Sequence, residues 1–217
     1  MYRYIDDKEF ISKMRSVCGE IMQDLCHILK EDYDIGAVFY LVGSGAKNLI
    51  LQNEQNPVDL DYNLEIMRCE DYERCRDIKE AVRKAFNKAL RNNDWSDCQD
   101  SRSSLTTEKR YFKSGNSTGF SMDVAITTRD NKDKYYRLIH KKTGIIVYDE
   151  YMWEEAHSSK KLKQKVDYIK RNGKWILVRK QYCDIKNRYL RQNDHNHPSF
   201  ICYLEAVNNV YSMKNNW

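Results

Sequence analysis

The sequence predicts an α+β fold, with a small mixed β-sheet flanked by helices and a helical lobe at the C-terminal end. Up to about residue 150, short apolar or alternating segments typical of strands are interspersed with two long amphipathic segments. From residue 158 onward only helical periodicity remains. We therefore expect two domains, a mixed α/β domain over residues 1–150 and a helical lobe over residues 151–217.

The first elements are a long helix, a buried strand and a tight turn. Asp6-x-x-Glu9 resembles a capping box, and apolar residues then recur at helical spacing to about Lys30. Residues 35–42 form a continuous apolar run, which is typical of a buried strand. The run ends at Gly43-Ser44-Gly45, and residues 46–52 are expected to form a short helix.

The middle of the chain alternates between strand and helix patterns. Residues 58–66 alternate strictly between apolar and polar, as expected of a strand with one buried face. Residues 71–91 have a helical apolar stripe, and residues 92–104 are polar and are expected to be a loop. Further strands are expected at 105–113 and 120–127. Residues 135–140 and 145–148 are expected to form either a hairpin or a strand with a flanking turn around Thr143-Gly144.

The C-terminal lobe combines helical periodicity with positive charge. Helices are expected at 158–171, at 174–191 and from Pro198 onward, with a break at Asn172-Gly173. The net charge of the chain is +5, and residues 158–217 contain thirteen Lys or Arg against four Asp or Glu. Such a surface is either an ordinary solvated helix face or a binding site for a polyanion, and charge alone does not favour one over the other.

Cysteine content and hydropathy predict a cytoplasmic protein. The seven cysteines are irregularly spaced and include no Cys-x-x-Cys pair, which does not resemble a disulfide framework. The longest apolar runs are too short to span a bilayer, and the N-terminus lacks the pattern of a signal peptide. We therefore expect no association with a membrane.

Three aspartates carry the most specific chemical signal. Asp59 and Asp61 are two residues apart on one strand, so their side chains project from the same face. Asp123 has the polar phase of a later strand. If the two strands are neighbours, three carboxylates converge, and bound cations are needed to relieve their repulsion. Magnesium prefers such oxygen ligands and binds substrate phosphates together with a few carboxylates.

Gly43-Ser44 is placed where a strand gives way to a short helix. Glycine allows the backbone to approach a phosphate closely, and amide groups at a helix start point toward an anion. The hydroxyl group of Ser44 adds a further donor. A Gly-Ser turn or an Asp-x-Asp pair alone is common. The combination of strand, Gly-Ser turn, short helix, Asp-x-Asp strand and a later Asp in phase is much more specific.

Residues 35–127 resemble the nucleotidyltransferase superfamily, which shares the polymerase-beta-like catalytic fold. The resemblance rests on Leu41-Val42-Gly43-Ser44, Val58-Asp59-Leu60-Asp61 and Met122-Asp123-Val124. It implies that the 1–150 domain is catalytic and that two Mg²⁺ ions, or alternatively Mn²⁺, are bound there. Asp59 and Asp61 would bind both metals, and Asp123 would assist the metal that activates the acceptor.

The same resemblance implies a nucleoside triphosphate as substrate, with ATP the default choice. Gly43 and Ser44 would contact its triphosphate. Additional positive charge is expected from Lys47, Lys160 and Lys163, since a triphosphate needs cations beyond the metal ions. Glu65, on the polar face of the Asp-x-Asp strand, is a candidate supporting group.

The acceptor of the nucleotidyl group is left open among three hypotheses. Basic residues interleaved with Tyr168, Trp175 and Tyr182 favour RNA, for example a tRNA end. The second hypothesis is nucleotidylation of a protein, as in toxin–antitoxin systems, or of a small molecule such as an antibiotic. The third is a nucleotide-binding or partner-binding module that has lost catalysis.

Overall fold

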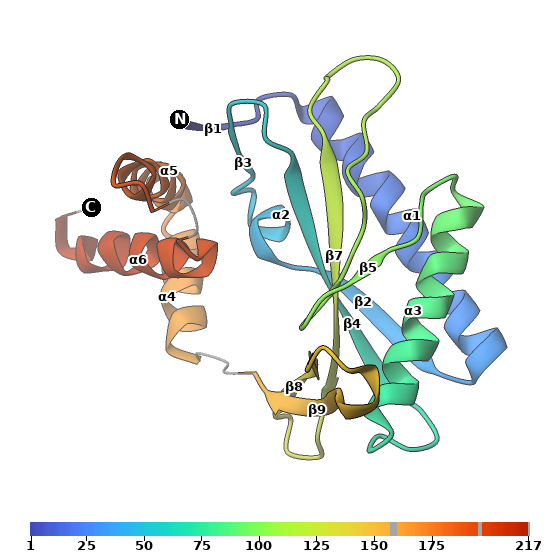
Figure 1. The fold of residues 1–217 in the computed structure, drawn as a ribbon. Coiled ribbons are helices and arrows are strands. Elements are labelled where there is room, and N and C mark those ends of the chain that lie inside the picture. The colour runs from blue at the N-terminus through green and yellow to red at the C-terminus, as the bar shows by residue number, and fades with distance from the viewer. Residues whose placement is uncertain (157–159, 195–196, 217) are drawn as a thin grey trace. The chain divides into compact units, whose positions relative to one another are not determined.

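The computed structural model describes residues 1–156, 160–194 and 197–216, and it divides the chain into two compact units (Figure 1). The larger unit comprises Asp7–Ala46 and Pro57–His157. The smaller unit comprises Met1–Asp6, Lys47–Asn56 and Ser158–Trp217. Compared with the division at residue 150 expected from the sequence, the smaller unit thus includes two additional segments from the N-terminal part of the chain.

A mixed seven-stranded sheet organises the larger unit. Its strands run in the order β2-β4-β7-β6-β5, with β8 paired to β7 and β9 paired to β8. β4 and β7 are parallel, whereas the other pairs are antiparallel. The bounds are β2 Gly36–Leu41, β4 Val58–Arg68, β5 Gln99–Asp100, β6 Leu105–Thr106, β7 Phe120–Arg129, β8 Tyr135–Lys141 and β9 Glu150–Glu155.

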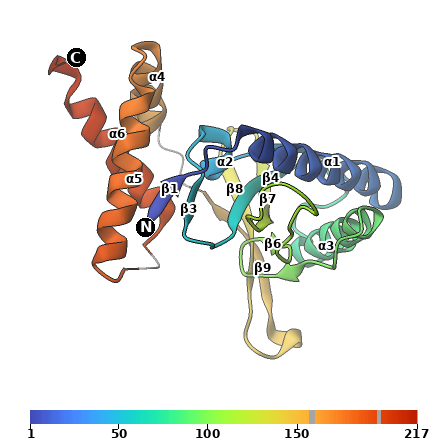
Figure 2. The ribbon, with the colours of Figure 1, turned by 90° about the horizontal axis from the view of Figure 1, so that it is seen from above.

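Helices α1 (Lys8–Tyr33) and α3 (Cys75–Asn92) lie side by side on one face of this sheet (Figures 1 and 2). The apolar stripes that predicted both helices supply the core, together with alternate residues of β4 and β7. The fully buried side chains include Met14, Ile21, Leu25, Val82, Phe86, Leu60, Leu64, Met122 and Val124. The opposite sheet face is therefore left for the polar residues of the same strands.

The start of α1 differs by one residue from the expected capping box. The N-cap is Asp7, not Asp6, and its carboxylate accepts a hydrogen bond of 2.9 Å from the amide of Phe10. The helix also continues to Tyr33, beyond the expected end at Lys30, and a left-handed Asp34 caps it.

Two other expectations of local structure were wrong, and a choice between two alternatives is settled. Residues 46–52 do not form one helix, because α2 spans Gly43–Lys47 and Leu51–Asn53 is strand β3. Of residues 105–113, only Leu105–Thr106 is a strand, and Arg110 forms an isolated bridge to Phe120. For residues 135–148, the alternative of a strand with a flanking turn is correct: Tyr135–Lys141 is strand β8, and Ile146–Tyr148 is a short exposed 3₁₀ turn before β9.

In the residues that the structure describes, the smaller unit has three α-helices and two short strands. Helices α4 (Lys160–Arg171), α5 (Trp175–Arg191) and α6 (Ser199–Ser212) match the predicted helical segments closely. Strand β1 (Tyr2–Tyr4) pairs antiparallel with β3 and is fixed to α5 by Asn187, whose side chain bonds both the amide and the carbonyl of Tyr2. The core of this unit comprises Leu49, Ile169, Val178, Tyr182, Ile185, Cys202, Ala206, Val207 and Val210. The N-terminal segment is therefore a structural part of the helical unit.

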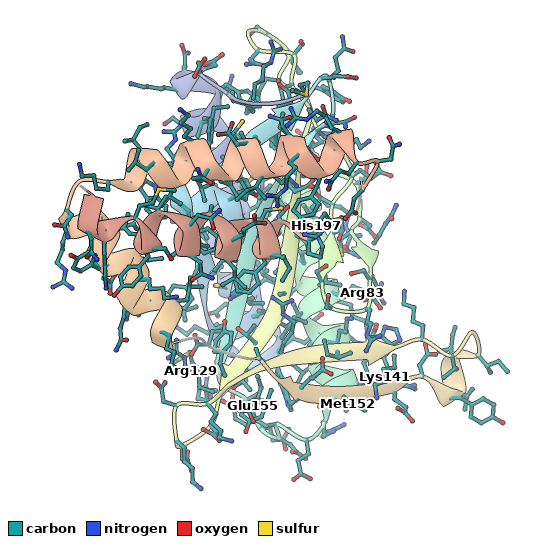
Figure 3. The ribbon with its side chains drawn as sticks, turned by 90° about the vertical axis from the view of Figure 1, so that its left-hand side faces the viewer. Arg83, Arg129, Lys141, Met152, Glu155 and His197 are labelled. Atoms are coloured by element: carbon teal, nitrogen blue, oxygen red, sulfur yellow. The ribbon has the colours of Figure 1, made fainter. Side chains whose placement is uncertain are left out.

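A buried charged network joins α3 to the β8–β9 hairpin. The Nζ of Lys79, a residue that is 1% exposed, lies 2.7 Å from the Asp100 carboxylate and donates a 2.9 Å bond to the carbonyl of Ser101. The two ring nitrogens of His140 lie 2.7 Å from Asp100 and 2.9 Å from Asp149. The His140 ring also stacks on Tyr151 of β9. Figure 3 shows this hairpin with Lys141, Met152 and Glu155 labelled. The network thereby holds the loop after β5 in place.

Burial lowers the pKa of Lys79, and the hydrogen bond and charge of Asp100 oppose that shift. Removing the ammonium group leaves the Asp100 carboxylate without its buried partner. We therefore expect Lys79→Met to lower the free energy of unfolding by about 3 kcal/mol, as measured by urea denaturation.

The matched control is Lys88→Met on the same helix. Lys88 forms a 2.7 Å ion pair with Asp32 at the exposed surface, so its loss is expected to change stability by less than about 1 kcal/mol. Equal stabilities of the two variants would show that the buried pair contributes nothing specific.

Candidate active site

The parallel pairing of β4 and β7 brings the predicted aspartates together. Asp61 and Asp123 are Cα partners in this pairing, and Asp59 is the partner of Ser121. Partner residues on neighbouring strands project from the same face of a sheet. All three carboxylates therefore lie on the polar face, opposite the helices, while the alternate residues Leu60 and Met122 are fully buried in the core.

Two hydroxyl groups hold two of the carboxylates. The Ser121 hydroxyl donates to Oδ1 of Asp59, and the Thr106 hydroxyl donates to Oδ1 of Asp123. Thr106 reaches Asp123 because it is the Cα partner of that residue on the other side of β7. The aspartates are thus positioned by hydrogen bonds from their own sheet.

The Asp123 carboxyl group carries an electrostatic cost. Burial raises its pKa, and the negative charge of nearby Asp59 raises that pKa further, against the lowering effect of the Thr106 hydrogen bond. This is the behaviour expected where carboxylates are gathered without a compensating positive charge. A bound cation would favour the ionised form of Asp123.

The Gly-Ser turn lies directly against Asp61. The amide of Val42 donates a 2.8 Å bond to the carbonyl of Asp61, which fastens the end of β2 to β4. Gly43 follows with a left-handed φ of +59°, and a methyl group at its α-carbon would overlap the Asp61 carboxylate. Glycine is therefore required both for the backbone conformation and for the space. Two residues later, the carbonyl of Gly45 accepts a hydrogen bond from Arg15 of α1.

The three aspartates have the ligand chemistry that magnesium prefers, and the pairing of their strands brings their backbones together. Asp59, Asp61 and Asp123 supply only carboxylate oxygens from two adjacent strands, the ligand type that magnesium prefers. Within the described residues, however, no three His, Cys, Asp or Glu side chains are grouped as a ready set of metal ligands. The Asp59 and Asp123 carboxylates face the Ser121 and Thr106 hydroxyls instead. The side chains, and not the strands, would have to turn for the three to share a cation.

The three predicted lysines all belong to the smaller unit. Lys47 ends α2, and its ammonium lies 5.2 Å from the centre of the Tyr203 ring. Lys163 is exposed on α4. Lys160 begins α4, and its side chain lies outside the part of the structure that is described. Their role toward a triphosphate stays a prediction.

Glu65 occupies a different place on the polar face from the aspartates. It follows Asp61 by four residues along β4, which corresponds to about 13 Å. Its side chain is buried and forms a 2.9 Å ion pair with Arg129. Glu65 therefore forms a structural ion pair near the end of β4.

Sequence reasoning missed Thr106, Ser121 and Arg15. Ser121 could have been found, because it shares the polar phase of Asp123 in an alternating strand. Thr106 and Arg15 could not, because their proximity depends on how β6 and α1 pack.

Comparison by sequence identifies no relative. No family model matches the chain, and no curated protein matches it.

Across the described residues, no helix combines the length and apolar character that crossing a bilayer requires. All seven cysteines are free, as the sequence predicted.

Solved structures do share the fold. The chain is similar to CdnC from E. coli MS115-1 in its complex with HORMA-deltaN, with a TM-score of 0.58 and 17% identity over 96% of this chain and 60% of that one. The structure of the same CdnC with ATP gives a TM-score of 0.57 and 16% identity over 93% of this chain and 61% of that one. The Vibrio cholerae DncV cyclic AMP-GMP synthase, in complex with the linear intermediate 5′-pppA(3′,5′)pG, gives a TM-score of 0.56. The identity is 10% over 83% of this chain and 62% of that one.

These similarities confirm the predicted fold class and the predicted resemblance. This chain has the α+β fold of the matched structures. It spans about three fifths of the length of each.

The contact between Gly43 and Asp61 can be tested by stability. Gly43→Ala combines the strain of a left-handed alanine, about 1–2 kcal/mol, with displacement of the Asp61 carboxylate. The control is Gly173→Ala, at a similar φ of +68° but with no atom within 4 Å of the added methyl group. We expect Gly43→Ala to lower the free energy of unfolding by clearly more than Gly173→Ala, as measured by denaturant titration. Equal losses would mean that Asp61 moves aside at no cost.

Proposed function

We propose that the chain is a metal-dependent nucleotidyltransferase that moves a nucleoside monophosphate from a nucleoside triphosphate to an acceptor hydroxyl group, with release of pyrophosphate. The observation that carries this proposal is the in-register pairing of Asp61 and Asp123, with Asp59 on the same face and the Gly43 turn against Asp61. The shared fold supports it independently of these side chains.

In the proposed reaction the acceptor oxygen forms a bond to the α-phosphorus while the bond to the pyrophosphate oxygen breaks. Asp59 and Asp61 would hold two magnesium ions, or manganese in their place, and Asp123 would share the ion nearer the acceptor. Bound there, the ions would neutralise charge on the phosphate oxygens and make the acceptor hydroxyl more acidic. The hydroxyl proton leaves to solvent or to a carboxylate oxygen.

The residues of the chain would act mainly by positioning. The hydroxyls of Ser121 and Thr106 each donate to one oxygen of Asp59 and Asp123. A turn of these two side chains would bring carboxylate oxygens to the ions. Gly43 and Ser44 would bring backbone amides to the triphosphate, and Lys47, Lys160 and Lys163 would add positive charge. ATP is the default donor, and the cytoplasm, where nucleoside triphosphates are abundant, is the proposed location.

A nucleotide is the acceptor that the comparisons favour. The structure of DncV contains a linear dinucleotide intermediate, which is a nucleotidyl group joined to a second nucleotide. RNA remains the second candidate, because α4 contains six Lys or Arg and a single acidic residue, Asp167. Protein or small-molecule acceptors, as in toxin–antitoxin or antibiotic modification, and an inactive binding module are the other outcomes.

The experiment is incubation of the protein with magnesium and each labelled nucleoside triphosphate, first alone and then with whole-cell RNA, protein and small solutes. Label in a dinucleotide without additions identifies a nucleotide acceptor. Label in RNA or protein identifies those acceptors. Tight nucleotide binding without any release of pyrophosphate, in every mixture, would support the inactive module and contradict the proposal.

Neutralising a single carboxylate should abolish the reaction. We expect Asp61→Asn and Asp123→Asn each to lower the rate of pyrophosphate release by about two orders of magnitude or more, since each removes a charge that the metal ions need. Asp97→Asn is the control, because Asp97 forms an exposed ion pair with Arg91 at the end of α3. Circular dichroism should show that all three variants remain folded. A rate for Asp61→Asn equal to that of the control would remove Asp61 from the chemistry.

A further inference from the structure

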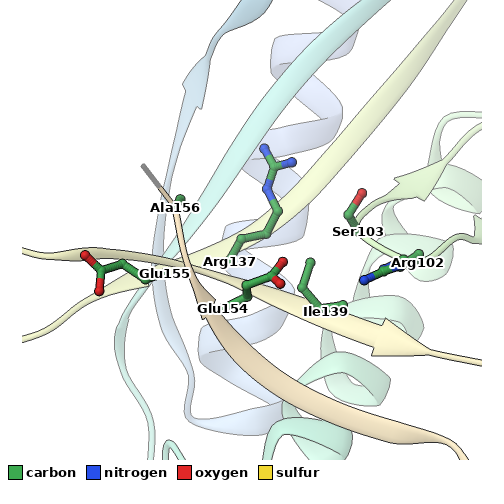
Figure 4. Close-up of a pocket in the computed structure, with 7 residues that line it drawn as sticks. All are labelled: Arg102, Ser103, Arg137, Ile139, Glu154, Glu155 and Ala156. Atoms are coloured by element: carbon green, nitrogen blue, oxygen red, sulfur yellow. The ribbon is translucent and has the colours of Figure 1, made fainter. Parts of the chain in front are cut away.

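A second polar site lies on the same sheet face as the aspartates. It is a pocket of about 360 Å³ lined by Arg102, Ser103, Arg137, Ile139, Glu154, Glu155 and Ala156 (Figure 4). This volume lies within the range typical of small-ligand sites. All seven residues belong to the larger unit.

Strand register connects this pocket to the carboxylates. Arg137 of β8 is the Cα partner of Thr127 on β7, and Thr127 follows Asp123 by four residues. Even spacing along β7 puts Thr127, and therefore Arg137, on the face that carries Asp123. The distance along the strand is about 13 Å, which is comparable to the length of one nucleotide with its phosphates.

The loop before β6 is a second connection between the pocket and the carboxylates. Arg102 and Ser103 precede Thr106, the residue whose hydroxyl donates to Asp123. The carbonyl of Arg102 accepts a 2.7 Å bond from the amide of His140, and the carbonyl of the preceding Ser101 is bound by buried Lys79. Arg102 is therefore carried by a backbone that the charged network holds in place.

The charges in the pocket are only partly balanced. Glu155 forms a 3.2 Å ion pair with Lys134. Neither Arg102 nor Arg137 forms an ion pair with any residue that the structure describes, although Glu154 is the Cα partner of Arg137. In Figure 4 the Arg137 guanidinium group extends away from the Glu154 carboxylate. Two guanidinium groups are thus left for an anion, and phosphate is the anion whose geometry they match best.

We propose that Arg102 and Arg137 bind the phosphate of the nucleotide whose hydroxyl group is the acceptor. This rests on the proposed function and deepens it, because it assigns a subsite to the acceptor. Glu154, left without Arg137, can accept hydrogen bonds from the hydroxyl or amino groups of that nucleotide, and Ile139 provides an apolar wall. The phosphate belongs either to a free nucleoside triphosphate or to the 3′-terminal nucleotide of an RNA.

The test compares Arg137→Ala, Arg102→Ala and Arg137→Lys with the wild type. At saturating donor, the KM for the acceptor is measured with the α,β-methylene analogues of ATP and GTP, which have an acceptor hydroxyl but cannot donate a nucleotidyl group, and with a short RNA. Arg137→Ala and Arg102→Ala are each expected to raise the acceptor KM at least tenfold, the loss of about one charge-assisted contact. The kcat and the donor KM should change by less than about twofold, and Arg137→Lys should recover part of the affinity.

Arg91→Ala is the matched control, since that arginine lies at the end of α3 in an exposed pair with Asp97. A raised KM for the mononucleotides alone identifies a free nucleotide as the ligand, and a raised KM for RNA alone identifies a 3′ end. An unchanged acceptor KM in both alanine variants overturns the subsite.

A binding measurement separates failure of the subsite from failure of the proposed function. Calorimetry with ATP in the presence of EDTA needs no catalysis and no metal. If the wild type catalyses no transfer but binds ATP about tenfold more tightly than Arg137→Ala, the pocket binds phosphate and the reaction assignment fails. The same measurement is made with the short RNA. If transfer occurs and neither ATP nor the RNA distinguishes the two proteins, the reaction assignment stands and the pocket assignment fails.

Discussion

The parallel register between β4 and β7 is the constraint on which the rest of the site depends. It makes Asp61 the neighbour of Asp123 and places Ser121 beside Asp59, while the alternate residues of both strands fill the core. Because side chains alternate along a strand, a shift of one residue would exchange the aspartates with Leu60 and Met122. The hydrophobic core therefore enforces the positions of the carboxylates, and burial of the apolar face stabilises an arrangement that electrostatic repulsion opposes. The raised pKa of Asp123 is one sign of that opposition.

The polar network around Lys79 supports the segments that carry Thr106 and Arg137. Lys79, Asp100 and His140 connect α3, the β5–β6 loop and the β8–β9 hairpin, and all three lie away from the aspartates in sequence. This network holds the loop that continues into Thr106, and it holds the strand that carries Arg137. Buried charge is costly unless it is paired, so a network of this kind is sensitive to the loss of any one member. It gives the irregular segment between α3 and β7 a fixed geometry that its short strands alone would not provide.

Where periodicity was long and one face was buried, the sequence was sufficient to predict structure. The alternation over residues 58–66 and 120–127 gave both central strands and the common polar face of Asp59, Asp61 and Asp123. Periodicity left two alternatives open where apolar residues are not buried: Ile146 and Val147, at 78% and 79% exposure, lie in a turn at the tip of a hairpin. Elsewhere it was misleading. It failed for Leu51–Asn53, a strand that exists only because Tyr2–Tyr4 from the N-terminus pairs with it. Such pairing between distant segments has no local signature, and the same reason hid the contact of Thr106 with Asp123.

The two kinds of charge on the polar face suggest a physical order for the site. Three carboxylates at one position repel phosphate unless cations are bound, whereas two arginines that pair with no described residue attract phosphate without any cation. A phosphate-bearing molecule approaching the metal-free face is therefore drawn toward Arg102 and Arg137 and away from Asp59, Asp61 and Asp123. On the proposed function, bound magnesium ions would reverse the sign of the field at the aspartates only, and the triphosphate of the donor would then be accommodated beside Gly43. Under the two proposals, electrostatics alone would separate a subsite that depends on metal from one that does not. The two lie on a single sheet face, about four residues of strand apart.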